Sequence, residues 1–450
     1  MAPMGKIASG GHDLKKVTVI MPCLNVVQYF KECIDSVVNQ TIFKDLEVLI
    51  VDAGSTDGTQ ELALFYAAKH ANIRVILSEK RSYGYQVNLG IKEASSKYVA
   101  ILETDDFIRE DMYEVLYDAA EEKHVDYVKA DYDLFFVLSN KQKLFKKMRF
   151  PSKQLDYNCV IDVTKRMDIS IYDFFVWKGI YHREFLINNK IYFNESPGAA
   201  YQDIGFGQIL HSHAKRALYL PDSLYRYRVG REQSSVNSGK GIIYNRNEFE
   251  RLLHLQDEYE LFMPGVYEAM LSGFIGEFGL LDAPAAASDE NILDCAHWIV
   301  NHLEEAIQSG IISEEMIRQD LGEDKLLQFR RIQKDIPGEM EKHVRMKRER
   351  RRQWTELSYI EESIYIFGAG NYGMNALRLL DSCGVQITGF LDNGADENKQ
   401  IAGYDVILPT NRIVGENARV IIANKFHADE IRKQLVDMGV DEANILEYKN

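Results

Sequence analysis

The sequence predicts an α/β fold with two α/β domains, the first of which contains a mostly parallel sheet. Near the amino terminus, three short apolar, β-branched runs alternate with helix-like stretches, an order that favours right-handed crossovers between parallel strands. A fourth run, from Tyr98 to Leu102, is apolar or aromatic without a break and therefore predicts a strand that is buried on both faces. Near the carboxyl terminus, a second strand–helix–strand pattern begins at Ile364.

The first three strands are expected at 17–21, 46–51 and 73–77, because each run is rich in Val, Ile and Leu. Residues 27–39 and 60–70 have apolar spacing that suits the two intervening helices. These segments together predict strand, helix, strand, helix and strand in sequence order.

Polar loops follow the first two strands, at the edge of the sheet where open α/β folds bind ligands. Pro22 ends the first strand, and Asn25 lies in the loop after it. The second strand runs into the turn 52–59, which is dense in Gly, Asp, Ser and Thr. Ser55 or Asp57 can cap the helix that follows this turn.

Three carboxylates, Glu103, Asp105 and Asp106, follow the buried run directly. Residues 103 and 105 point to the same side if the backbone stays extended. Unpaired, these charges would repel one another and would be costly to desolvate. A divalent cation resolves the repulsion, and a hard cation with oxygen ligands also holds a diphosphate. The alternative is a solvated acidic turn after a strand.

Length and composition narrow the class of protein. The 450 residues are enough for two or three domains, and the apolar fraction of 46% is ordinary for a globular chain. The formal charge of −15 argues against a general nucleic-acid binder, because no basic excess exists to neutralise phosphates.

The expected localisation is cytoplasmic. Five scattered cysteines without a C-x-x-C pair fit a reducing compartment and no zinc site. No stretch approaches about 18 consecutive apolar residues, so no membrane-spanning helix is expected. Residues 1–16 lack the apolar core of a signal peptide and are expected to form a loose tail.

Four short motifs occur in an order that is typical of one enzyme family: P-C-L-N at 22–25, V-D-A-G-S-T-D at 51–57, N-L-G-I at 88–91 and E-T-D-D at 103–106. With this set, the block from Val17 to Asp106 resembles the nucleotide-binding half of family 2 glycosyltransferases, which have the GT-A fold. The resemblance implies inverting transfer of a hexose from a nucleotide-sugar, with UDP as the expected nucleotide. The sequence departs from the family pattern at Leu24, Ala53, Val87 and Glu103.

The resemblance implies roles for the residues of these motifs. Asp105 is expected to hold a divalent cation, Mn²⁺ or Mg²⁺, that stabilises the charge on the departing diphosphate. Asp52 can accept a hydrogen bond from a uracil N–H, and its alternative is an Asx role in its own turn. The other candidates for contact with the nucleotide-sugar are Pro22, Asn25, Ser55, Asp57, Asn88, Glu103, Thr104 and Asp106.

An inverting transferase also needs a general base near the acceptor hydroxyl. The family usually supplies it as the Asp of an E-D pair that opens a helix, and the matching pair in this chain is Gln202-Asp203. Asp203 is therefore the expected base. Its alternative role is that of a helix N-terminal acid favoured by the dipole.

Two further segments resemble ligand-binding parts of the family. The aromatic stretch 172–187 contains Trp177 and Lys178 at positions that lie near the acceptor in the family, although core packing is the alternative for its aromatic residues. The segment 225–235 resembles a part that closes over the diphosphate. Its candidates are Arg228, Arg231 and Ser234 or Ser235, with surface salt bridges as the alternative.

Two basic runs have open interpretations. Residues 141–149 predict a solvated hairpin face, and residues 341–352 predict a solvated linker helix. The alternative for each run is contact with an anionic membrane surface, which would suit a lipid-linked acceptor. Between the runs, residues 241–340 are expected to form helices, with a break at 282–288 and no catalytic motif.

The carboxyl-terminal part carries a dinucleotide-type pattern. A strand at 364–367 precedes a G-x-G-x-x-G motif at Gly368, Gly370 and Gly373, and Asp392 follows the strand expected at 386–391. The segment resembles the small Rossmann-like domain at the amino end of certain sugar acetyltransferases. It predicts either a second nucleotide site at these four residues or glycines that serve only a tight turn.

The expected organisation is a tail at 1–16, a GT-A domain at 17–240, a helical region with a basic linker at 241–355 and a Rossmann-like domain at 356–450. The leading hypothesis is a metal-dependent glycosyltransferase of polysaccharide biosynthesis that acts on a glycan or lipid-linked glycan. One alternative is an NAD(P)-linked oxidoreductase or epimerase that uses residues 364–392. Another is a non-catalytic nucleotide-sugar-binding scaffold. A homo-oligomer formed through the last domain is a further hypothesis.

Overall fold

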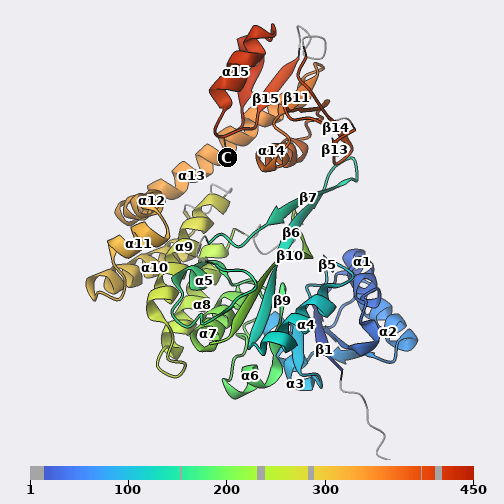
Figure 1. Cartoon of the computed structure of the whole chain (residues 1–450). Helices are drawn as coiled ribbons and strands as arrows, with labels where there is room; N and C mark the ends of the chain where they lie inside the picture. The colour runs from blue at the N-terminus through green and yellow to red at the C-terminus, as the bar shows by residue number, and fades with distance from the viewer. Residues whose placement is uncertain are drawn as a thin grey trace, which may run out of the picture.

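The computed structural model describes residues 15–152, 155–230, 239–281, 288–396, 398–410 and 418–449. Along the chain it contains a large sheet domain, a helical region and a small second sheet domain (Figure 1). The predicted α/β class, helical middle and second small α/β domain are confirmed. None of the helices in the described ranges combines the length and apolar character that crossing a membrane requires.

The first domain extends to the end of β10. Its elements are β1 (Val17–Cys23), α1 (Val27–Val38), β2 (Leu46–Asp52), α2 (Thr59–Lys69), β3 (Ile73–Leu77), α3 (Tyr83–Glu93), β4 (Tyr98–Ile101), β5 (Phe107–Ile108), α4 (Met112–Lys123), β6 (Tyr127–Val137), β7 (Lys143–Met148), β8 (Val160–Ile161), α5 (Met167–Tyr172), β9 (Gly179–His182), α6 (Arg183–Asn188), α7 (Gln202–His213) and β10 (Ala217–Arg228). The strands and helices expected before residue 102 are confirmed to within two residues at each end.

One sheet joins these strands in the order β3-β2-β1-β4-β9-β6-β10-β5. The neighbours of β1, which are β2 and β4, both run parallel to it, and β3 runs parallel to β2. All the residues of β1 and β4 are buried, as expected for strands that are covered on both faces. Their carboxyl ends therefore open on the same edge of the sheet, where the loops 22–25 and 103–106 lie.

A long hairpin extends from this sheet. β7 pairs antiparallel with the second half of β6 and projects away from the sheet toward the carboxyl-terminal domain (Figure 1). Three apolar residues of the hairpin, Phe136, Leu138 and Leu144, belong to the same core as Trp354 and Leu377 of the distal part. The face formed by residues 141–149 was expected to be solvated. This expectation is wrong for Leu144, which packs against the carboxyl-terminal domain.

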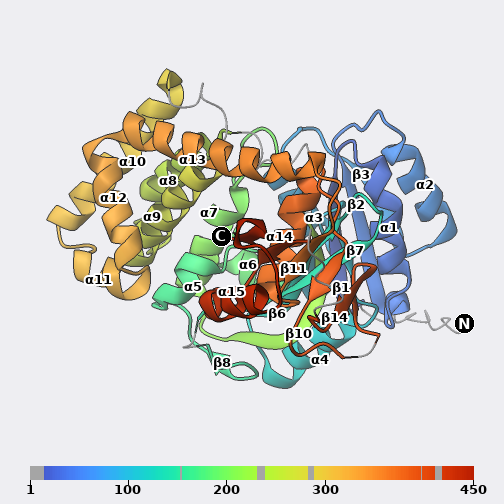
Figure 2. The ribbon, with the colours of Figure 1, turned by 90° about the horizontal axis from the view of Figure 1, so that it is seen from above.

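The helical region consists of α8 (Gly241–Leu255), α9 (Met263–Leu280), α10 (Glu290–Gln308), α11 (Glu314–Asp320), α12 (Glu323–Lys334) and α13 (Ile336–Glu356). It shares the large core of the first domain, and α8 and α9 lie beside α7 and α5 (Figure 2). The break expected at 282–288 lies outside the described residues except for Ser288. The helices therefore support the side of the first domain that carries Asp203.

The carboxyl-terminal domain contains β11 (Ile364–Phe367), α14 (Asn371–Ser382), β12 (Gly389–Leu391), β13 (Gln400–Ile401), β14 (Tyr404–Ile407), β15 (Arg419–Ile422), α15 (Ala428–Asp437) and β16 (Ile445–Glu447). Its strand order is β13-β14-β12-β11-β15-β16. The strand β11 lies between two parallel neighbours, β12 and β15. This order places a switch point of the sheet at the carboxyl end of β11.

Candidate functional site

A cleft of about 700 Å³ opens at the carboxyl ends of β1 and β4 and extends to the first turn of α7. Seven predicted site residues line it: Pro22, Asn25, Glu103, Thr104, Asp105, Trp177 and Asp203. Its volume is in the range of small-molecule and cofactor sites. Residues from distant parts of the chain thus meet at one cavity, at the edge of the sheet that the motifs predicted.

The acidic segment after β4 forms a turn rather than an extended strand. The backbone N–H of Asp106 donates to the carbonyl of Glu103 at 3.1 Å, so the alternation expected for residues 103 and 105 does not apply. Glu103 and Asp105 nevertheless both reach the cleft. The hydroxyl of Tyr83 donates to Oε1 of Glu103 at 2.5 Å, which orients that carboxylate.

Asp106 lies behind the cleft wall. Its carboxylate is 1% exposed and accepts hydrogen bonds from the Tyr225 hydroxyl and the Arg228 backbone N–H, both at 2.7 Å. Burial, followed by the charge of Asp105, raises the pKa of Asp106 well above its ordinary value. This mutual repulsion among the acids favours a cation at the turn. Asp106 itself supports the turn and is not one of the cleft-lining residues.

The described residues contain no group of three or more His, Cys, Asp or Glu side chains that could hold a metal ion by themselves. Asp105, with Glu103 beside it, instead offers a carboxylate edge to a hard cation whose other oxygen ligands would come from a diphosphate and water. The donor set therefore fits Mn²⁺ or Mg²⁺ bound together with a nucleotide.

Asp52 is fully buried below the cleft and does not line it. Its carboxylate accepts from the backbone N–H groups of Gly54 and Ser55, each at 3.2 Å, and from Nε2 of Gln60 at 3.1 Å. The hydroxyl of Ser55 also donates to it, at 2.5 Å. These contacts match the Asx alternative, and the expected contact with uracil stays a prediction.

Ser55 and Asp57 hold the first loop in place. The backbone N–H of Asn25 donates to the Ser55 hydroxyl, and that of Val27 donates to the Asp57 carboxylate, both at 3.0 Å. In return, Oδ1 of Asn25 accepts from the backbone N–H of Thr56 at 2.8 Å. The two loops therefore form one unit, in which Asn25 faces the cleft and Ser55 and Asp57 are its supports.

Asn88 connects α3 to the backbone of the segment that contains Phe193. Its side-chain amide exchanges two hydrogen bonds with the backbone of Phe193, at 3.0 and 2.9 Å, and does not line the cleft. A neighbour on α3, Gln86, does line the cleft and donates to the carbonyls of Cys23 and Val51, at 3.0 and 2.6 Å. Sequence reasoning missed Gln86.

Asp203 lies in the first turn of α7 and faces the cleft. Burial raises the pKa of its carboxyl to about 6, against the opposing effects of a hydrogen bond from the Ile204 backbone N–H and the charge of Lys129. An acid placed only to satisfy the helix dipole would have a lowered pKa. The raised pKa favours the expected role as a base that is ionised at neutral pH.

Gln202 holds the loop that precedes Asp203. Its Nε2 donates to the carbonyls of Ser196 and Gly198, both at 3.2 Å, and its Oε1 accepts from the backbone N–H of Ala200 at 2.9 Å. A glutamate could not donate to these carbonyls, so the departure from the family pair has a structural reason. The departure was visible in the sequence, but its role was not.

Two other cleft residues carried no signal in the sequence. Tyr201 precedes α7 with φ +65°, and its hydroxyl donates to the buried Glu277 of α9 at 2.6 Å. Arg81 also lines the cleft and is exposed, which makes it a cation within reach of a bound anion. Both come from segments whose proximity depends on the tertiary fold.

Arg228 supports the acidic turn and is not among the cleft-lining residues. Its Nε donates to the carbonyl of Asp105 at 2.7 Å, and its guanidinium pairs with Glu32 of α1. Arg228 thus has a supporting role, and its expected contact with phosphate oxygens stays a prediction. The predictions for Arg231, Ser234 and Ser235 fall outside the described residues.

Trp177 is 4% exposed and stacks on Tyr225 and Tyr227, with centroids 4.3 and 5.0 Å apart. It therefore belongs mainly to the core, as the alternative held, although one edge reaches the cleft. The stack makes the Trp177 edge a rigid part of the cleft wall.

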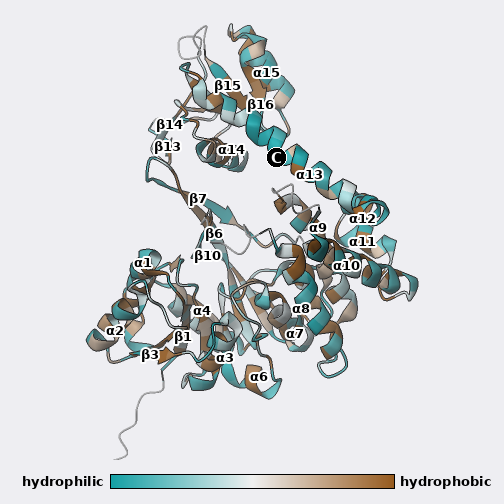
Figure 3. Ribbon diagram, turned by 180° about the vertical axis from the view of Figure 1, so that it is seen from behind, coloured by the Kyte–Doolittle hydropathy of each residue, from teal (hydrophilic) through white to brown (hydrophobic). Residues whose placement is uncertain are grey.

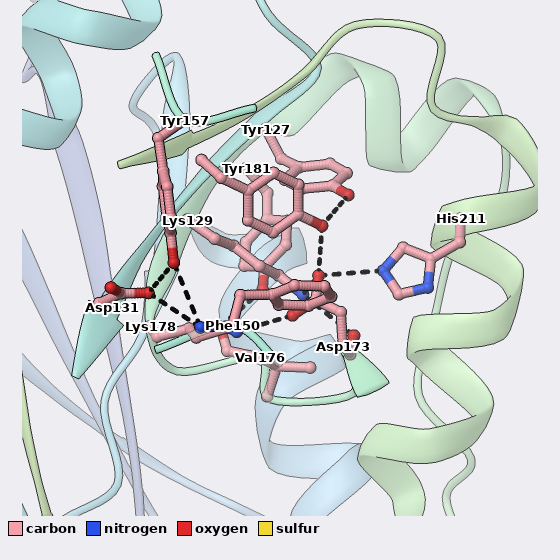
Figure 4. A network of polar contacts seen from close by, with 11 residues as sticks. Tyr127, Lys129, Asp131, Phe150, Tyr157, Asp173, Val176, Lys178, Tyr181 and His211 are labelled. Atoms are coloured by element: carbon pink, nitrogen blue, oxygen red, sulfur yellow. Dashed lines mark hydrogen bonds and ion pairs between the residues drawn. The ribbon is translucent and has the colours of Figure 1, made fainter. Parts of the chain in front are cut away.

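Lys178 lies in a buried ionic network behind the site (Figure 4). Its Nζ is 2.9 Å from Oδ1 of Asp173, and Nζ of Lys129 is 2.9 Å from the other oxygen. Nε2 of His211 is 3.3 Å from the same carboxylate. The expectation that Lys178 contacts the acceptor is corrected, because its side chain is only 5% exposed and is directed to Asp173.

The glycine motif of the last domain forms a tight turn. Gly368 has φ +112°, and a Cβ on Gly373 would lie 1.9 Å from the carbonyl oxygen of Gly368. Asp392 accepts a hydrogen bond from the backbone N–H of Ala369 at 2.7 Å. This N–H is therefore already paired and does not face a pyrophosphate as a free donor. Gly368 and Asp392 line a pocket of about 230 Å³, whereas Gly370 and Gly373 do not. The turn role is therefore supported, and the second nucleotide site stays a prediction.

Two known protein families match separate parts of the chain. Residues 18–201 match the family described as "Glycosyl transferase family 2". Residues 360–446 match the family described as "C2185-like, N-terminal". Residues 18–201 are therefore similar to family 2 glycosyltransferases, and the protein is a glycosyltransferase.

Individual relatives agree with this class. The chain is 28% identical over 321 residues to the uncharacterized glycosyltransferase EpsJ of Bacillus subtilis, covering 67% of this chain and 85% of the relative. It is 31% identical over 220 residues to the uncharacterized glycosyltransferase YibD of Escherichia coli, covering 48% and 62% of the two chains.

A solved structure has the same fold at lower identity. S. aureus TarS 1–349, crystallised in complex with UDP-GlcNAc, matches with a TM-score of 0.53 and 18% identity, over 74% of this chain and 92% of that one. The likeness supports the GT-A-like α/β architecture of the first domain.

Proposed function

We propose that the protein is an inverting, metal-dependent glycosyltransferase that moves a hexose from a nucleotide-sugar, most simply a UDP-hexose, to a hydroxyl of a glycan or lipid-linked glycan. The observation that carries this proposal is the shared cleft, which brings the acidic turn and Asp203 together from segments almost 100 residues apart. A donor diphosphate and an acceptor hydroxyl need these two groups on one cavity.

Asp203 is the proposed general base. With a pKa of about 6 it is ionised at neutral pH and still basic enough to take the acceptor proton as the oxygen attacks. Attack on the anomeric carbon from the face opposite the leaving diphosphate inverts the configuration. Gln202 and Tyr201 keep the first turn of α7 in place during this step.

Asp105, with Glu103 beside it, is proposed to hold the Mn²⁺ or Mg²⁺ ion. When bound, the cation neutralises charge that develops on the departing nucleoside diphosphate. The Tyr83 hydroxyl fixes the Glu103 carboxylate, and Arg228 fixes the carbonyl of Asp105. Among cleft residues, Asn25 and Thr104 are proposed to contact the nucleotide, and the Trp177 edge is proposed to contact a sugar.

The setting of the reaction is also a proposal. A UDP donor is supported by the motif set and by TarS, a protein of the same fold that binds UDP-GlcNAc. We place the enzyme at the cytoplasmic face of the membrane, in the assembly of a surface polysaccharide. Contact with the membrane would follow from the basic helix α13, and the last domain would be the dimer surface of a homo-oligomer.

Two variants separate donor binding from transfer. Asp105→Ala should lose the metal-dependent rise in thermal midpoint that UDP, GDP or CDP gives the wild type. A saturating ligand at about a hundred times its dissociation constant should contribute roughly 2.7 kcal/mol. Asp203→Asn should keep that rise and lose transfer. Full transfer by Asp203→Asn would disprove the base, and nucleotide binding without transfer to any acceptor by the wild type would favour a scaffold.

A further inference from the structure

The tip of the β6–β7 hairpin is held by the carboxyl-terminal domain. The backbone N–H and hydroxyl of Ser139 donate to the carboxylate of Asp381, at 3.1 and 2.5 Å. The guanidinium of Arg378 lies 4.7 Å from the ring centroid of Phe136. Leu138 and Leu144 belong to an apolar core that the hairpin shares with the carboxyl-terminal domain. The tip is therefore fixed by both polar and apolar contacts.

The middle of the same hairpin contacts the segment that directly follows the acidic turn. Phe107, which directly follows Asp106, packs edge-on against Phe135 of β6 and Phe145 of β7, with ring centroids 4.9 and 6.5 Å apart. Phe135 and Phe145 are themselves 5.9 Å apart. The aromatic side chains of the hairpin therefore fix one end of the turn that carries Asp105.

A chain of charges connects the hairpin to the turn by a second route. Lys143 of β7 pairs with Glu32 of α1, and Glu32 pairs with Arg228. Arg228 then donates from Nε to the carbonyl of Asp105 and from its backbone N–H to the Asp106 carboxylate, both at 2.7 Å. The Arg228 side chain is only 10% exposed, so this contact is sheltered from solvent.

We propose that the carboxyl-terminal domain is a positioning part of the donor site. By holding the hairpin tip, the domain keeps the contacts of the hairpin with Glu32 and Phe107 in place. Together with Arg228, these contacts hold Asp105 in the geometry that binds metal and diphosphate. Beyond Phe135, where β6 no longer pairs with β10, the hairpin has only two strands and is marginally stable by itself, so the docked domain supplies the order that this part lacks. The part of this inference that concerns metal and nucleotide binding rests on the proposed function. The part that concerns the order of the acidic turn, residues 103–106, does not.

The test uses the full chain with the double variant Arg378→Ala/Asp381→Ala. This variant removes the contacts of Arg378 and Asp381 with the hairpin tip. The matched control is Glu362→Ala, which breaks an ion pair of the same domain with Arg419, far from the hairpin in sequence and contact. Circular dichroism and thermal unfolding first establish that each variant is folded. Hydrogen exchange in the peptide 102–108 is then measured without ligand, together with the dissociation constant for UDP with Mn²⁺.

The double variant should exchange the 102–108 amides faster and bind UDP with Mn²⁺ about five-fold or more weakly, a coupling of ordinary allosteric size. The control should change neither quantity. Unchanged exchange in a folded double variant would overturn the inference. If the wild type binds no nucleotide with metal, the proposed function fails, and the exchange result still decides the inference.

A second variant tests the route through charges. Glu32→Gln should weaken metal-dependent UDP binding by a similar factor, because Arg228 loses its anionic partner. Combined with Arg378→Ala/Asp381→Ala, its effect should be less than multiplicative, since both changes act on the same contacts. A fully multiplicative loss would overturn the role of Glu32 in this coupling.

Discussion

Asp203 combines two properties that a general base needs, an open face on the cleft and a raised pKa. The pKa is about 6 because burial of the carboxyl, which raises it, outweighs the hydrogen bond from the Ile204 backbone N–H and the charge of Lys129, which lower it. At this pKa the group is ionised at pH 7 and remains a stronger base than an ordinary aspartate. Burial at the helix terminus is therefore the main cause of the raised pKa of Asp203.

The pH profile of transfer follows from this value. We expect kcat to rise with pH through an apparent pKa near 6, because Asp203 must lose its proton before it can accept one. The measurement is kcat at saturating donor, metal and acceptor from pH 4.5 to 8. A rise centred near 3.8, the ordinary value for aspartate, would contradict the assignment.

Glu268 gives a prediction about stability. Its side chain on α9 is fully buried, and neither carboxyl oxygen has a hydrogen-bond partner among the described residues. Burial raises its pKa to about 8, so the folded state binds a proton that the unfolded chain releases near pH 4.5. Stability contributed by this proton is present at low pH and is lost as pH rises toward 8.

Glu268→Gln should therefore be more stable than the wild type at pH 8 and differ little at pH 5. The gain should grow by roughly 1.4 kcal/mol for each pH unit above the unfolded value, to about 3–4 kcal/mol at pH 7, and should level off above the folded pKa of about 8. Urea unfolding at the two pH values measures it, with Glu341→Gln on the surface of α13 as the control. An equal gain at both pH values would contradict the raised pKa.

At the scale of elements, the loop 196–200 and the start of α7 act as one unit. A parallel bridge between Ser82 and Gly198 attaches the loop to the segment before α3, and Gln202 holds it from the inside. Tyr201 joins the same unit to α9 through Glu277. The helical region beyond the family 2 match thus contributes to the side of the cleft that carries Asp203.

Gln202→Glu restores the pair that the family usually has, and we expect it to weaken this unit. An ionised glutamate would face the carbonyls of Ser196 and Gly198 without a proton to donate, at a cost of about 1–3 kcal/mol. Thermal unfolding at pH 8 measures the loss. Gln202→Met, which removes the hydrogen bonds without adding charge, should lose less, and a Gln202→Glu protein as stable as the wild type would contradict this account.

At the scale of the whole molecule, the two basic runs, residues 141–149 and 341–352, make different contacts. In the hairpin, Lys143 pairs with Glu32, and Lys146 donates to Asn375 at 3.1 Å. In α13, the described residues show no ion pair for Arg345, Arg348 or Arg351, and Figure 3 shows this helix as largely hydrophilic between the two sheet domains. Lys143 thus binds the first domain and Lys146 the carboxyl-terminal domain, whereas Arg345, Arg348 and Arg351 of α13 face solvent.

This difference gives a prediction for membrane contact. Arg348→Glu/Arg351→Glu/Arg352→Glu should lose salt-sensitive sedimentation with vesicles that contain an anionic lipid, because each cation near such a surface contributes about 1 kcal/mol. Lys165→Glu/Lys425→Glu/Lys433→Glu makes the same change in net charge at exposed positions elsewhere and should retain binding. Equal loss in both triple variants would show that net charge, not α13, is responsible.

Much of the fold was determined by the sequence alone. Apolar runs and helix-like spacing gave the strands and helices of the first domain to within two residues, because buried parallel strands require unbroken apolar side chains. The motif residues also predicted which loops meet, since the carboxyl ends of β1 and β4 share one edge. Asn25, Asp105 and Asp203, which the motifs indicated together, accordingly line one cavity.

The tertiary structure decided which polar residues face the ligand and which hold the loops. Asp52, Asn88, Lys178 and Arg228 were candidates by type and position, yet each forms contacts with distant backbone or side chains that no local pattern encodes. The pairing of Tyr201 with Glu277 and the docking of the hairpin on the last domain are equally non-local. Sequence periodicity fixes the burial of elements, whereas the partner of a polar group depends on how those elements pack.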